Sequence, residues 1–359
     1  MDQNKKNILI SPLNWGLGHA SRLIPIINFL TENNHNTIIA GNGASLELLR
    51  QKFPHLKYYV ISAPEMYYGN KKAINIKLIW CFVKQLINIP IERYKTKKIV
   101  NQNQIDIIIS DTRPGIFNKK TTNIYITHQI NVYLSKNQCP IGKLLTKLHY
   151  WIIDKYTYCL VPDISGEKSL TGRLSNTDKL KNVHYIGILS RFADMETEFN
   201  KSHKKDNDIL CILSGPEPQR SILEQKIIDS IIESNLKTII IRGIIGSSKR
   251  KTIKNIKLYD TTNDEELLSL IHNSKLIICR SGYSSLMDLA ALNKKALIIP
   301  TPGQPEQEYL AQRLKEIYDF KTCNQNNLTL NLLFTDYNQS ENWFVNHNQG
   351  YREFFKNIL

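Results

Sequence analysis

A short glycine-containing loop near the start of the chain leads to a histidine that could serve as a catalytic base. Gly16, Gly18 and His19 follow an apolar run at 7–11 and precede an apolar stretch of helical period at 23–30. A strand, a glycine turn and a helix start point backbone N–H groups and the positive end of the helix dipole at an anion or a sugar. Histidine, with an unperturbed pKa of ~6.5, can take the proton of a hydroxyl near neutral pH. We therefore expect His19 to be the base, and a helix-capping role is the alternative.

Two later apolar runs of the first half also end in polar residues. One run leads to Asp111 and Arg113, and the next leads to His128 and Gln129. Because the carboxyl ends of parallel strands meet at one edge of a sheet, we expect these tips to lie near the glycine loop and to bind an acceptor. His128 is a second candidate for the base, and a purely structural histidine is the alternative. The candidate acceptor-binding residues are Gly16, Gly18, Asp111, Arg113, His128 and Gln129.

The second half of the chain repeats the arrangement of strand, turn and helix start. Ser281 and Gly282 follow an apolar run, and the helix that begins there carries Ser284 and Ser285 in its first turn. Free N–H groups and hydroxyls at such a helix start would hold a diphosphate. Asp288, one or two turns later, would accept both hydroxyls of a ribose. Each feature also has a structural explanation, since serines cap helices and a carboxylate on a helix is usually solvated.

The sequence disfavours three other kinds of site. A dinucleotide site would need a third glycine near Ser21 and an acidic residue after the second strand, where Gly41 and Asn42 stand. No G-x-x-x-x-G-K-[ST] phosphate loop is present. The pair Asp206 and Asp208 resembles a metal-binding D-x-D motif, but it precedes a strand instead of following one, so we interpret it as part of a linker. We therefore expect no metal site and no bound cofactor.

The composition is that of a globular chain with a strong positive charge. Of the 359 residues, 42% are apolar, and the six cysteines lie far apart without a C-x-x-C pair, which is typical of free thiols in a reducing compartment. The net charge of +15 would favour nucleic acid, an anionic membrane or a phosphorylated substrate. Because no zinc-finger spacing, RNP-type motif or arginine-rich segment occurs, we expect no nucleic-acid partner.

The apolar segments also bear on localisation. The residues after Met1 are polar, and no apolar run approaches the ~18 residues that span a bilayer. We expect a cytoplasmic protein, which could be peripheral at the inner face of the cell membrane. Segments 74–90 and 141–155 combine lysines with Trp, Tyr and Leu at helical spacing, and either could lie on an anionic membrane surface. Core helices whose lysines reach out to solvent are the alternative.

Apolar runs alternate with stretches of helical period along the whole chain, which predicts β-α units feeding parallel sheets. The polar segment 192–208 is typical of a linker. We expect an acceptor-binding domain at 1–188 and a nucleotide-sugar-binding domain at 189–359, with a final helix within 340–359 that could pack back on the first domain. The expected strands are 7–11, 37–40, 58–61, 105–110, 123–127, 157–161, 208–213, 238–242, 256–259, 275–279 and 296–300.

The segment from Arg280 to Asp288, followed by a strand and by Gln304, Gln307 and Glu308, resembles the C-terminal domain of glycosyltransferase family 28. The first glycine loop is similar to the family's acceptor loop. The family includes an enzyme that adds N-acetylglucosamine to the undecaprenyl-linked muramyl precursor of peptidoglycan. The resemblance implies a GT-B fold, in which two Rossmann-like, doubly wound α/β domains face each other across a cleft. It also implies a nucleoside diphosphate sugar as donor, without an essential metal.

The resemblance assigns donor-binding residues as well. Asp288 takes the ribose-binding acidic position, which is normally Glu, Gln307 and Glu308 face the donor sugar, and Arg191 corresponds to an arginine near the donor phosphates. Loop 213–220 stands where the family has a more glycine-rich phosphate loop, and its two prolines remove N–H donors, which leaves the identity of the donor open. The donor-binding residues are Arg191, Ser214, Gly215, Arg280, Ser281, Gly282, Ser284, Ser285, Asp288, Gln304, Gln307 and Glu308.

These expectations combine into an inverting, metal-independent glycosyltransferase. Its donor would be a UDP-sugar, with N-acetylhexosamine as one option for the sugar, and its acceptor a glycan or glycolipid of the cell envelope. In a single displacement, His19 would take the acceptor proton while the diphosphate leaves toward the helix start at Gly282, Arg191 and the Ser214–Gly215 loop. A sugar-nucleotide epimerase or hydrolase of the same fold and a nucleotide-sugar-binding protein without turnover are the alternatives.

Overall fold

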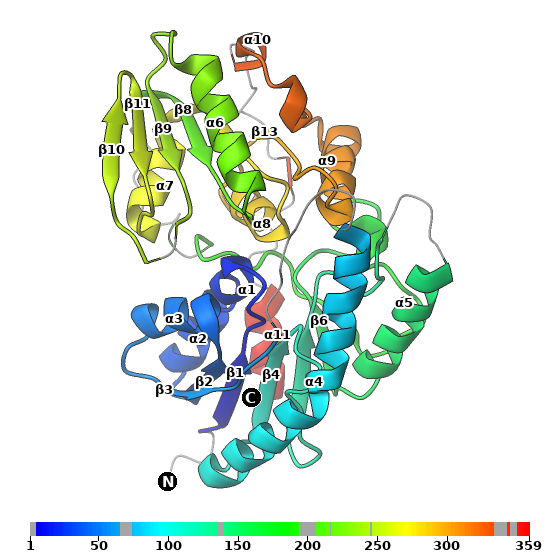
Figure 1. The fold of residues 1–359 in the computed structure, drawn as a ribbon. Helices are drawn as coiled ribbons and strands as arrows, with labels where there is room; N and C mark the ends of the chain where they lie inside the picture. Colours follow the sequence, from blue (N-terminus) through cyan, green and yellow to red (C-terminus); the bar gives the residue numbers. More distant parts are fainter. Residues whose placement is uncertain are drawn as a thin grey trace. The chain divides into compact units, whose positions relative to one another are not determined.

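The chain folds into two compact units. The computed structural model describes residues 5–64, 74–134, 140–193, 195, 206–215, 217–244, 246–333, 343–344 and 350–359. The first unit contains the described residues up to Arg191 together with the C-terminal helix, and the second contains the described residues from Phe192 to Phe344 (Figure 1). The predicted linker at 192–208 lies mostly outside the described residues.

The first unit is built on a parallel sheet of seven strands in the order β3-β2-β1-β4-β5-β6-β7. The strand order reverses between β1 and β4, and ligands of doubly wound sheets bind beyond the carboxyl ends of the strands at such a point. The strands are β1 (Asn7–Ser11), β2 (Asn36–Gly41), β3 (Lys57–Val60), β4 (Ile107–Asp111), β5 (Thr122–Ile126), β6 (Tyr158–Val161) and β7 (Val183–Tyr185).

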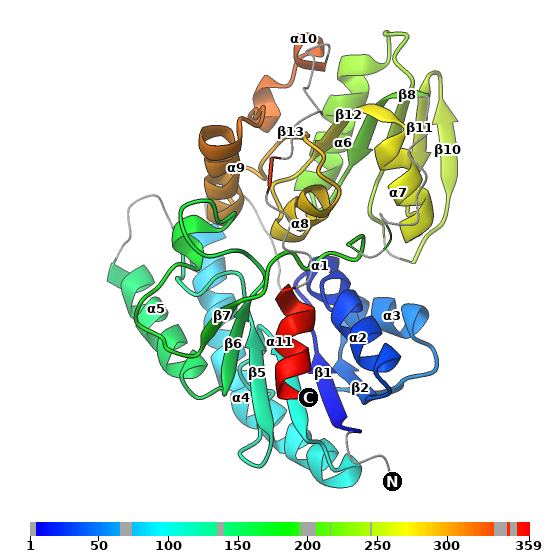
Figure 2. The ribbon, with the colours of Figure 1, turned by 180° about the vertical axis from the view of Figure 1, so that it is seen from behind.

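Helices cover both faces of this sheet, which explains why its central strands are apolar on both sides. Ile8 and Ile10 of β1 pack with α2, α3 and α11 on one face, and Leu9 packs with α4 on the other. Figure 2 shows α11, in red, lying along the first face. The helices are α1 (Leu17–Ser21), α2 (Ile24–Glu32), α3 (Gly43–Lys52), α4 (Ile74–Asn103), α5 (Pro140–Ile153) and α11 (Gly350–Ile358).

Helix α11 returns the end of the chain to the core of the first unit. Tyr351 and Phe355 are fully buried in the core that includes α2. The rings of Phe29 and Tyr351 meet edge to face, with 6.3 Å between centroids and 81° between planes, a favoured aromatic geometry. The C-terminal residues are therefore an integral layer of the first unit.

The second unit has a six-stranded sheet in the order β10-β11-β9-β8-β12-β13, in which only β10 is antiparallel to its neighbour. The order reverses between β8 and β12. The strands are β8 (Asn207–Ile212), β9 (Thr238–Ile241), β10 (Arg250–Ile253), β11 (Ile256–Tyr259), β12 (Ser274–Cys279) and β13 (Leu297–Ile298). The helices are α6 (Gln219–Ile231), α7 (Asp264–His272), α8 (Tyr283–Ala291), α9 (Pro305–Tyr318) and α10 (Leu330–Leu333).

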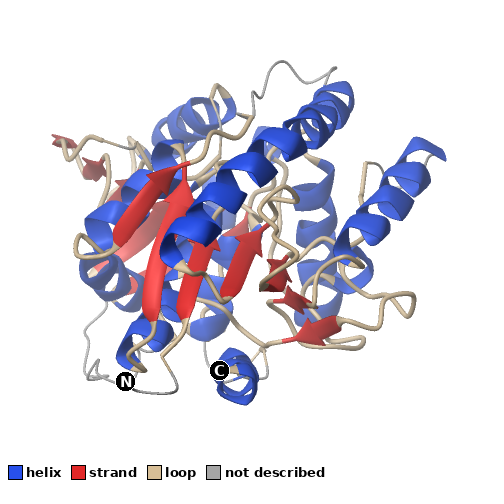
Figure 3. Cartoon of the chain, turned by 90° about the horizontal axis from the view of Figure 1, so that it is seen from below, coloured by secondary structure: helices blue, strands red, loops and turns tan. Residues whose placement is uncertain are grey.

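Local chemistry fixes several helix ends in this unit. The Asn263 side chain caps α7 by accepting a 2.8 Å hydrogen bond from the N–H of Glu266, as the preference for Asn at this position predicts. Helix α9 begins at Pro305, where the missing N–H has no consequence, and its C-cap residue, Asp319, lies in the left-handed region with φ 54°. In Figure 3 the strands, in red, lie between helices, in blue.

The prediction of two doubly wound α/β units is confirmed, and all eleven predicted strands are present with ends that shift by up to two residues. Two edge strands, β7 and β10, were not predicted. In the part of the chain that the structure describes, no helix combines the length and the apolar character needed to cross a bilayer.

Candidate active site

A cluster of four polar residues lies at the carboxyl edge of the first sheet, where the strand order reverses. His19 and Arg22 come from α1 and its C-cap after β1, Asp111 ends β4, and His128 follows β5. These strands are neighbours, so residues about 90 and 110 positions apart in the sequence meet at one edge. Gly16, with φ 118°, makes the turn from the β1 loop into α1, a conformation that suits glycine.

Hydrogen bonds join these four side chains into one network. The Nδ1 atom of His19 lies 2.9 Å from Oδ1 of Asp111. Arg22 donates from Nε to Oδ2 of Asp111 at 2.6 Å, and its Nη2 contacts the other carboxylate oxygen. Its Nη1 lies 2.9 Å from Nδ1 of His128. The structure thus brings together three of the predicted residues, His19, Asp111 and His128, around an arginine that was not predicted.

The electrostatics of the cluster suit a neutral base next to an ionised carboxylate. Burial lowers the pKa of His19 below its ordinary value, and the Asp111 carboxylate only partly opposes this effect. Burial alone would raise the pKa of Asp111, but the Arg22 guanidinium and the His19 ring hold it well below its usual range. The His19 side chain keeps 16% of its surface exposed, whereas Asp111 is fully buried. A substrate can therefore reach His19 but not Asp111.

Arg113, predicted to bind the acceptor, lies in the interior of the first unit instead. It is fully buried and donates to Oε1 of Glu92 from Nε at 3.0 Å and from Nη2 at 2.7 Å. It also donates to Ser11 Oγ at 3.2 Å and to the carbonyl of Ile61 at 2.9 Å. The guanidinium thus ties the ends of β1 and β3 to α4 and does not face the surface where an acceptor would bind.

The other predicted acceptor residues stay near the cluster. Gly16 is exposed and Gly18 is partly buried, and the carbonyl of Gly18 accepts hydrogen bonds from Ser21 and from the N–H of Arg22. Gln129 is partly buried, and its N–H donates to Thr127 Oγ1 at 3.1 Å. These residues shape the loops on either side of the two histidines.

At the carboxyl edge of the second sheet, most of the predicted donor residues lie on the loops after β8, β12 and β13 or in the helices that follow these loops. Ser214 and Gly215 follow β8, and Gly215 has φ 96° and is exposed. Gly282 is the N-cap of α8 and has no side chain to satisfy the N–H groups of the first turn. Those groups, together with the partly exposed Ser284 and Ser285, form an anion-binding type of helix start.

The loops after β12 and β13 are tied together through Gln307. Ser281 Oγ donates to the backbone carbonyl of Gln307 at 2.7 Å. The N–H of Thr301 donates to Oε1 of the Gln307 side chain at 2.9 Å. Gln307 is buried, whereas Gln304 is partly exposed and Glu308 is exposed, with Oε1 accepting from the N–H of Gly303 at 2.8 Å. The Gln307 side chain therefore braces the loop beside the start of α8.

Arg280, predicted to bind the donor, is also an interior residue. It is 1% exposed and donates to the carbonyls of Ile299, Pro300 and Gln219 at 3.2, 3.1 and 2.8 Å, and to Gln325 Oε1 at 2.6 Å. Burial lowers its pKa to about 10. Its role is to hold the α6, β12 and β13 loops in place.

The remaining predicted donor residues, Asp288 on α8 and Arg191 at the end of the first unit, are both partly buried. Across the described ranges, no group of three or more His, Cys, Asp or Glu side chains is arranged to hold a metal ion.

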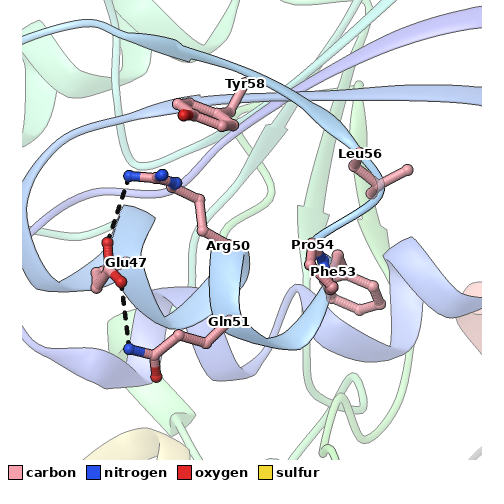
Figure 4. Close-up of a pocket in the computed structure, with 7 residues that line it drawn as sticks. All are labelled: Glu47, Arg50, Gln51, Phe53, Pro54, Leu56 and Tyr58. Atoms are coloured by element: carbon pink, nitrogen blue, oxygen red, sulfur yellow. Dashed lines mark hydrogen bonds and ion pairs between the residues drawn. The ribbon is translucent and has the colours of Figure 1, made fainter.

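A shallow pocket elsewhere on the first unit, between α3 and β3, is not part of the candidate site. Figure 4 shows Glu47 bonded to Arg50 and Gln51, at 3.5 and 3.2 Å. The Arg50 guanidinium stacks 4.0 Å from the centre of the Tyr58 ring. None of the predicted site residues lines this pocket.

Sequence reasoning missed Arg22, the residue that joins the cluster. The available signal was an arginine three residues after His19, just before the apolar run at 23–30. A charge at that point of an otherwise buried helix requires a partner, and Asp111 at the end of the neighbouring strand β4 supplies it.

Comparisons with known proteins relate this chain to glycosyltransferases. The Glycosyltransferase family 28 C-terminal domain matches residues 211–339, which lie in the second unit. The UDP-N-acetylglucosamine--N-acetylmuramyl-(pentapeptide) pyrophosphoryl-undecaprenol N-acetylglucosamine transferase of Prochlorococcus marinus strain AS9601 is 25% identical over 283 residues, covering 74% of this chain and 71% of that protein.

Solved structures share the fold over nearly the whole chain. The glycotransferase of kitacinnamycin superposes with a TM-score of 0.61 at 11% identity, covering 99% of this chain and 96% of that one. The UDP-GlcNAc 2-epimerase of Methanocaldococcus jannaschii superposes with a TM-score of 0.52 at 14% identity, covering 99% of each chain. The GT-B fold is thereby confirmed, and it is shared by a transferase and an epimerase.

Proposed function

Given that this chain belongs to glycosyltransferase family 28, we propose that it moves a sugar from a UDP-sugar to a hydroxyl of a lipid-linked or cell-envelope glycan. The observation that carries this proposal is the His19–Asp111 pair at the edge of the first sheet. In this pair His19 is a neutral base: its Nδ1 atom bonds Asp111, and its Nε2 atom would accept the proton of a substrate hydroxyl. N-acetylglucosamine, named for the relative from Prochlorococcus marinus, is the first sugar to test.

The proposed reaction is a single displacement at the anomeric carbon. Nδ1–H of His19 donates to Asp111, so Nε2 carries the lone pair and takes the proton of the acceptor hydroxyl. The acceptor oxygen forms a bond to the anomeric carbon as the bond from that carbon to the diphosphate oxygen breaks. Attack from the side opposite the leaving group inverts the configuration.

The leaving diphosphate carries the developing negative charge. Under this proposal, the N–H groups at the start of α8, Ser284, Ser285 and the Ser214–Gly215 loop bind it, and Arg191 adds positive charge. Such fixed donors stabilise charge without an additional cofactor. Asp288, on the second turn of α8, would bind the ribose hydroxyls.

Donor binding is tested by calorimetric titration with UDP, dTDP and their sugars. We expect one nucleoside diphosphate to bind the wild-type chain and the Ser284→Ala/Ser285→Ala variant to bind it 10-fold or more weakly, because a hydrogen bond to a charged group contributes ~1.5–3 kcal/mol. The control is Ser230→Ala on α6, whose hydroxyl donates to the carbonyl of Lys226 in the same helix. Equal affinities in all three proteins would reject the α8 site.

The epimerase of the same fold supports a second candidate function, conversion of the donor sugar without transfer. Incubating the chain with UDP-N-acetylglucosamine, with and without a membrane lipid extract, separates the two. Transfer predicts UDP release that requires the extract and a product of inverted configuration in proton NMR. A new UDP-sugar epimer formed without extract would establish the second candidate instead.

We also propose that the first unit docks on an anionic membrane surface. Helix α4 exposes 55% of Trp80, 67% of Ile87 and 61% of Tyr94, which recur on one side of the helix, and α5 exposes 66% of Leu144 and 59% of Trp151. Exposed fractions of this size argue against the alternative that these side chains are core. Both helices pack on the same face of the sheet.

Lysines accompany these aromatic side chains, as in helices that lie on anionic lipid. The ammonium groups of Lys84, Lys98 and Lys155 lie 5.7, 4.6 and 3.0 Å from the ring centres of Trp80, Tyr94 and Trp151. Flotation with phosphatidylglycerol vesicles at low salt should carry the protein upward, and vesicles of phosphatidylcholine alone should not. Protein that stays at the bottom with both lipids would reject the docking surface.

A cytoplasmic location, at the inner face of the membrane, is part of the same proposal. The five cysteines in the described ranges are free thiols, and four of them are buried. This usage fits a reducing compartment.

A further inference from the structure

Arg22 contacts every other member of the cluster in the first unit. Its side chain is 3% exposed. Its Nε and Nη2 both reach the Asp111 carboxylate, Nη1 lies 2.9 Å from Nδ1 of His128, and Nη2 lies 3.0 Å from Nδ1 of His19. One guanidinium therefore touches the same ring atom, Nδ1, of two histidines that have different neighbours.

The contact with His128 determines where that ring carries its proton. A guanidinium has only N–H donors and no acceptor. Nδ1 of His128 must therefore accept the hydrogen bond from Nη1, and in the neutral ring the proton then sits on Nε2. Nε2 of His128 is consequently an N–H donor, and this ring cannot act as a base.

The contact of His19 with Asp111 places the proton of the His19 ring on the other nitrogen, Nδ1. A carboxylate only accepts hydrogen bonds, so at 2.9 Å Nδ1 of His19 donates to Oδ1 of Asp111. Nη2 of Arg22 has a closer partner in the same carboxylate oxygen than in the His19 ring. The guanidinium thus bonds the carboxylate, and Nε2 of His19 keeps its lone pair.

We propose that Arg22 is a positioning residue that assigns opposite tautomers to the two histidines, with Nδ1–H on His19 and Nε2–H on His128. Resting on the proposed function, this makes His19 the base and excludes His128, whose one lone pair accepts from Arg22. It distinguishes between the two histidines that the sequence left as rival bases. The same guanidinium keeps Asp111 ionised, which holds the His19 tautomer.

The tautomers can be measured without any substrate. Nitrogen-15 NMR of protein labelled in histidine distinguishes the two neutral forms, and His19→Gln and His128→Gln variants assign the two signals. At pH 8 we expect Nδ1–H for His19 and Nε2–H for His128 in the wild-type chain. Nε2–H on His19 or Nδ1–H on His128 overturns the proposal, whatever the activity.

The Arg22→Lys variant tests whether the arginine sets these forms. Lysine keeps the charge but is a single point donor, which cannot bond Asp111 and His128 together in the same way. We expect the His128 signals to become a mixture of tautomers while His19 keeps Nδ1–H, and transfer to fall about 10²-fold in kcat with unchanged donor affinity. An unmixed Nε2–H signal from His128 in the lysine variant would refute the role of Arg22.

The outcome is separable from that of the proposed function. Predicted tautomers in a chain that transfers no sugar would leave the assignment by Arg22 standing and reject the transferase reaction. Transfer by a chain with the reverse tautomers would do the opposite.

Discussion

Replacing Arg113 by methionine tests whether this residue is structural or binds a substrate. The wild-type guanidinium is fully buried and bonds Glu92, Ser11 and Ile61. Methionine fills much of the space but leaves the Glu92 carboxylate, 1% exposed, without its cation. Breaking a buried pair in this way costs ~3–5 kcal/mol. We therefore expect the first unit to lose that much free energy of unfolding.

The double variant Arg113→Met/Glu92→Met separates the charge from the packing. An apolar pair of similar volume is often as stable as a buried ion pair. We expect the double variant to be more stable than Arg113→Met alone, although the N–H of Gly115 then loses its 3.1 Å bond to Glu92. The exposed pair of Arg50 and Glu47, with 42% and 51% of the side chains exposed, supplies the control. Glu47→Gln should change stability by no more than ~0.5 kcal/mol.

Tryptophan fluorescence during urea unfolding can report on the first unit alone. The four tryptophans are Trp15, Trp80 and Trp151 in the first unit and Trp343 in the second. In a Trp343→Phe background, the fluorescence transition follows only the first unit, and its midpoint measures each substitution. A loss below ~1 kcal/mol in Arg113→Met, together with a large fall in acceptor-dependent turnover, would refute the structural role and restore Arg113 as an acceptor-binding residue.

Three further substitutions of the first unit can be followed with the same assay. Gly115→Ala should destabilise it by ~1–3 kcal/mol, because the added Cβ would lie 2.4 Å from Oε2 of Glu92; an unchanged midpoint would contradict this. Phe355→Ala should lower the free energy of unfolding by ~3–5 kcal/mol, since that ring is fully buried against α2. A loss no larger than that of the exposed Glu47→Gln control would show that α11 is not part of the core. Burial lowers the pKa of His149 from 6.5 to about 4, so the unfolded state takes up the proton first as the pH falls from 7 to 4 and stability drops by ~3 kcal/mol. His149→Leu should flatten that pH profile, and an equally steep profile in the variant would exclude His149 as its cause.

The buried strands could be predicted because they are apolar on both faces, as in β4 and β12. The two missed strands lie at sheet edges and lack this signal. β10, Arg250–Ile253, is polar and mostly exposed, and β7, Val183–Tyr185, has three residues with no fully buried side chain. Edge strands are held by pairing with one neighbour, which a local sequence pattern does not record.

The candidate site was predictable to the extent that strand ends determine position. His19, Asp111 and His128 meet because β1, β4 and β5 are adjacent. The direction of an arginine after a strand was not predictable in the same way. Both arginines, Arg113 and Arg280, turn inward. Arg113 bonds Glu92, which lies 21 residues away in the sequence. Arg280 bonds the carbonyls of Ile299 and Pro300, which lie 19 and 20 residues away. Long-range pairing of this kind also hid Arg22, whose carboxylate partner is 89 residues away.

The central claim is that His19 accepts the acceptor proton, and the most direct measurement is UDP release by His19→Ala, with donor affinity determined on the same sample. His35→Ala, which removes a partly exposed histidine of the same unit, is the matched control. We predict that turnover with UDP-N-acetylglucosamine and a membrane lipid extract falls by ~10²–10⁴-fold in His19→Ala while the donor Kd stays within about twofold. Turnover equal to that of the His35→Ala control would contradict the claim.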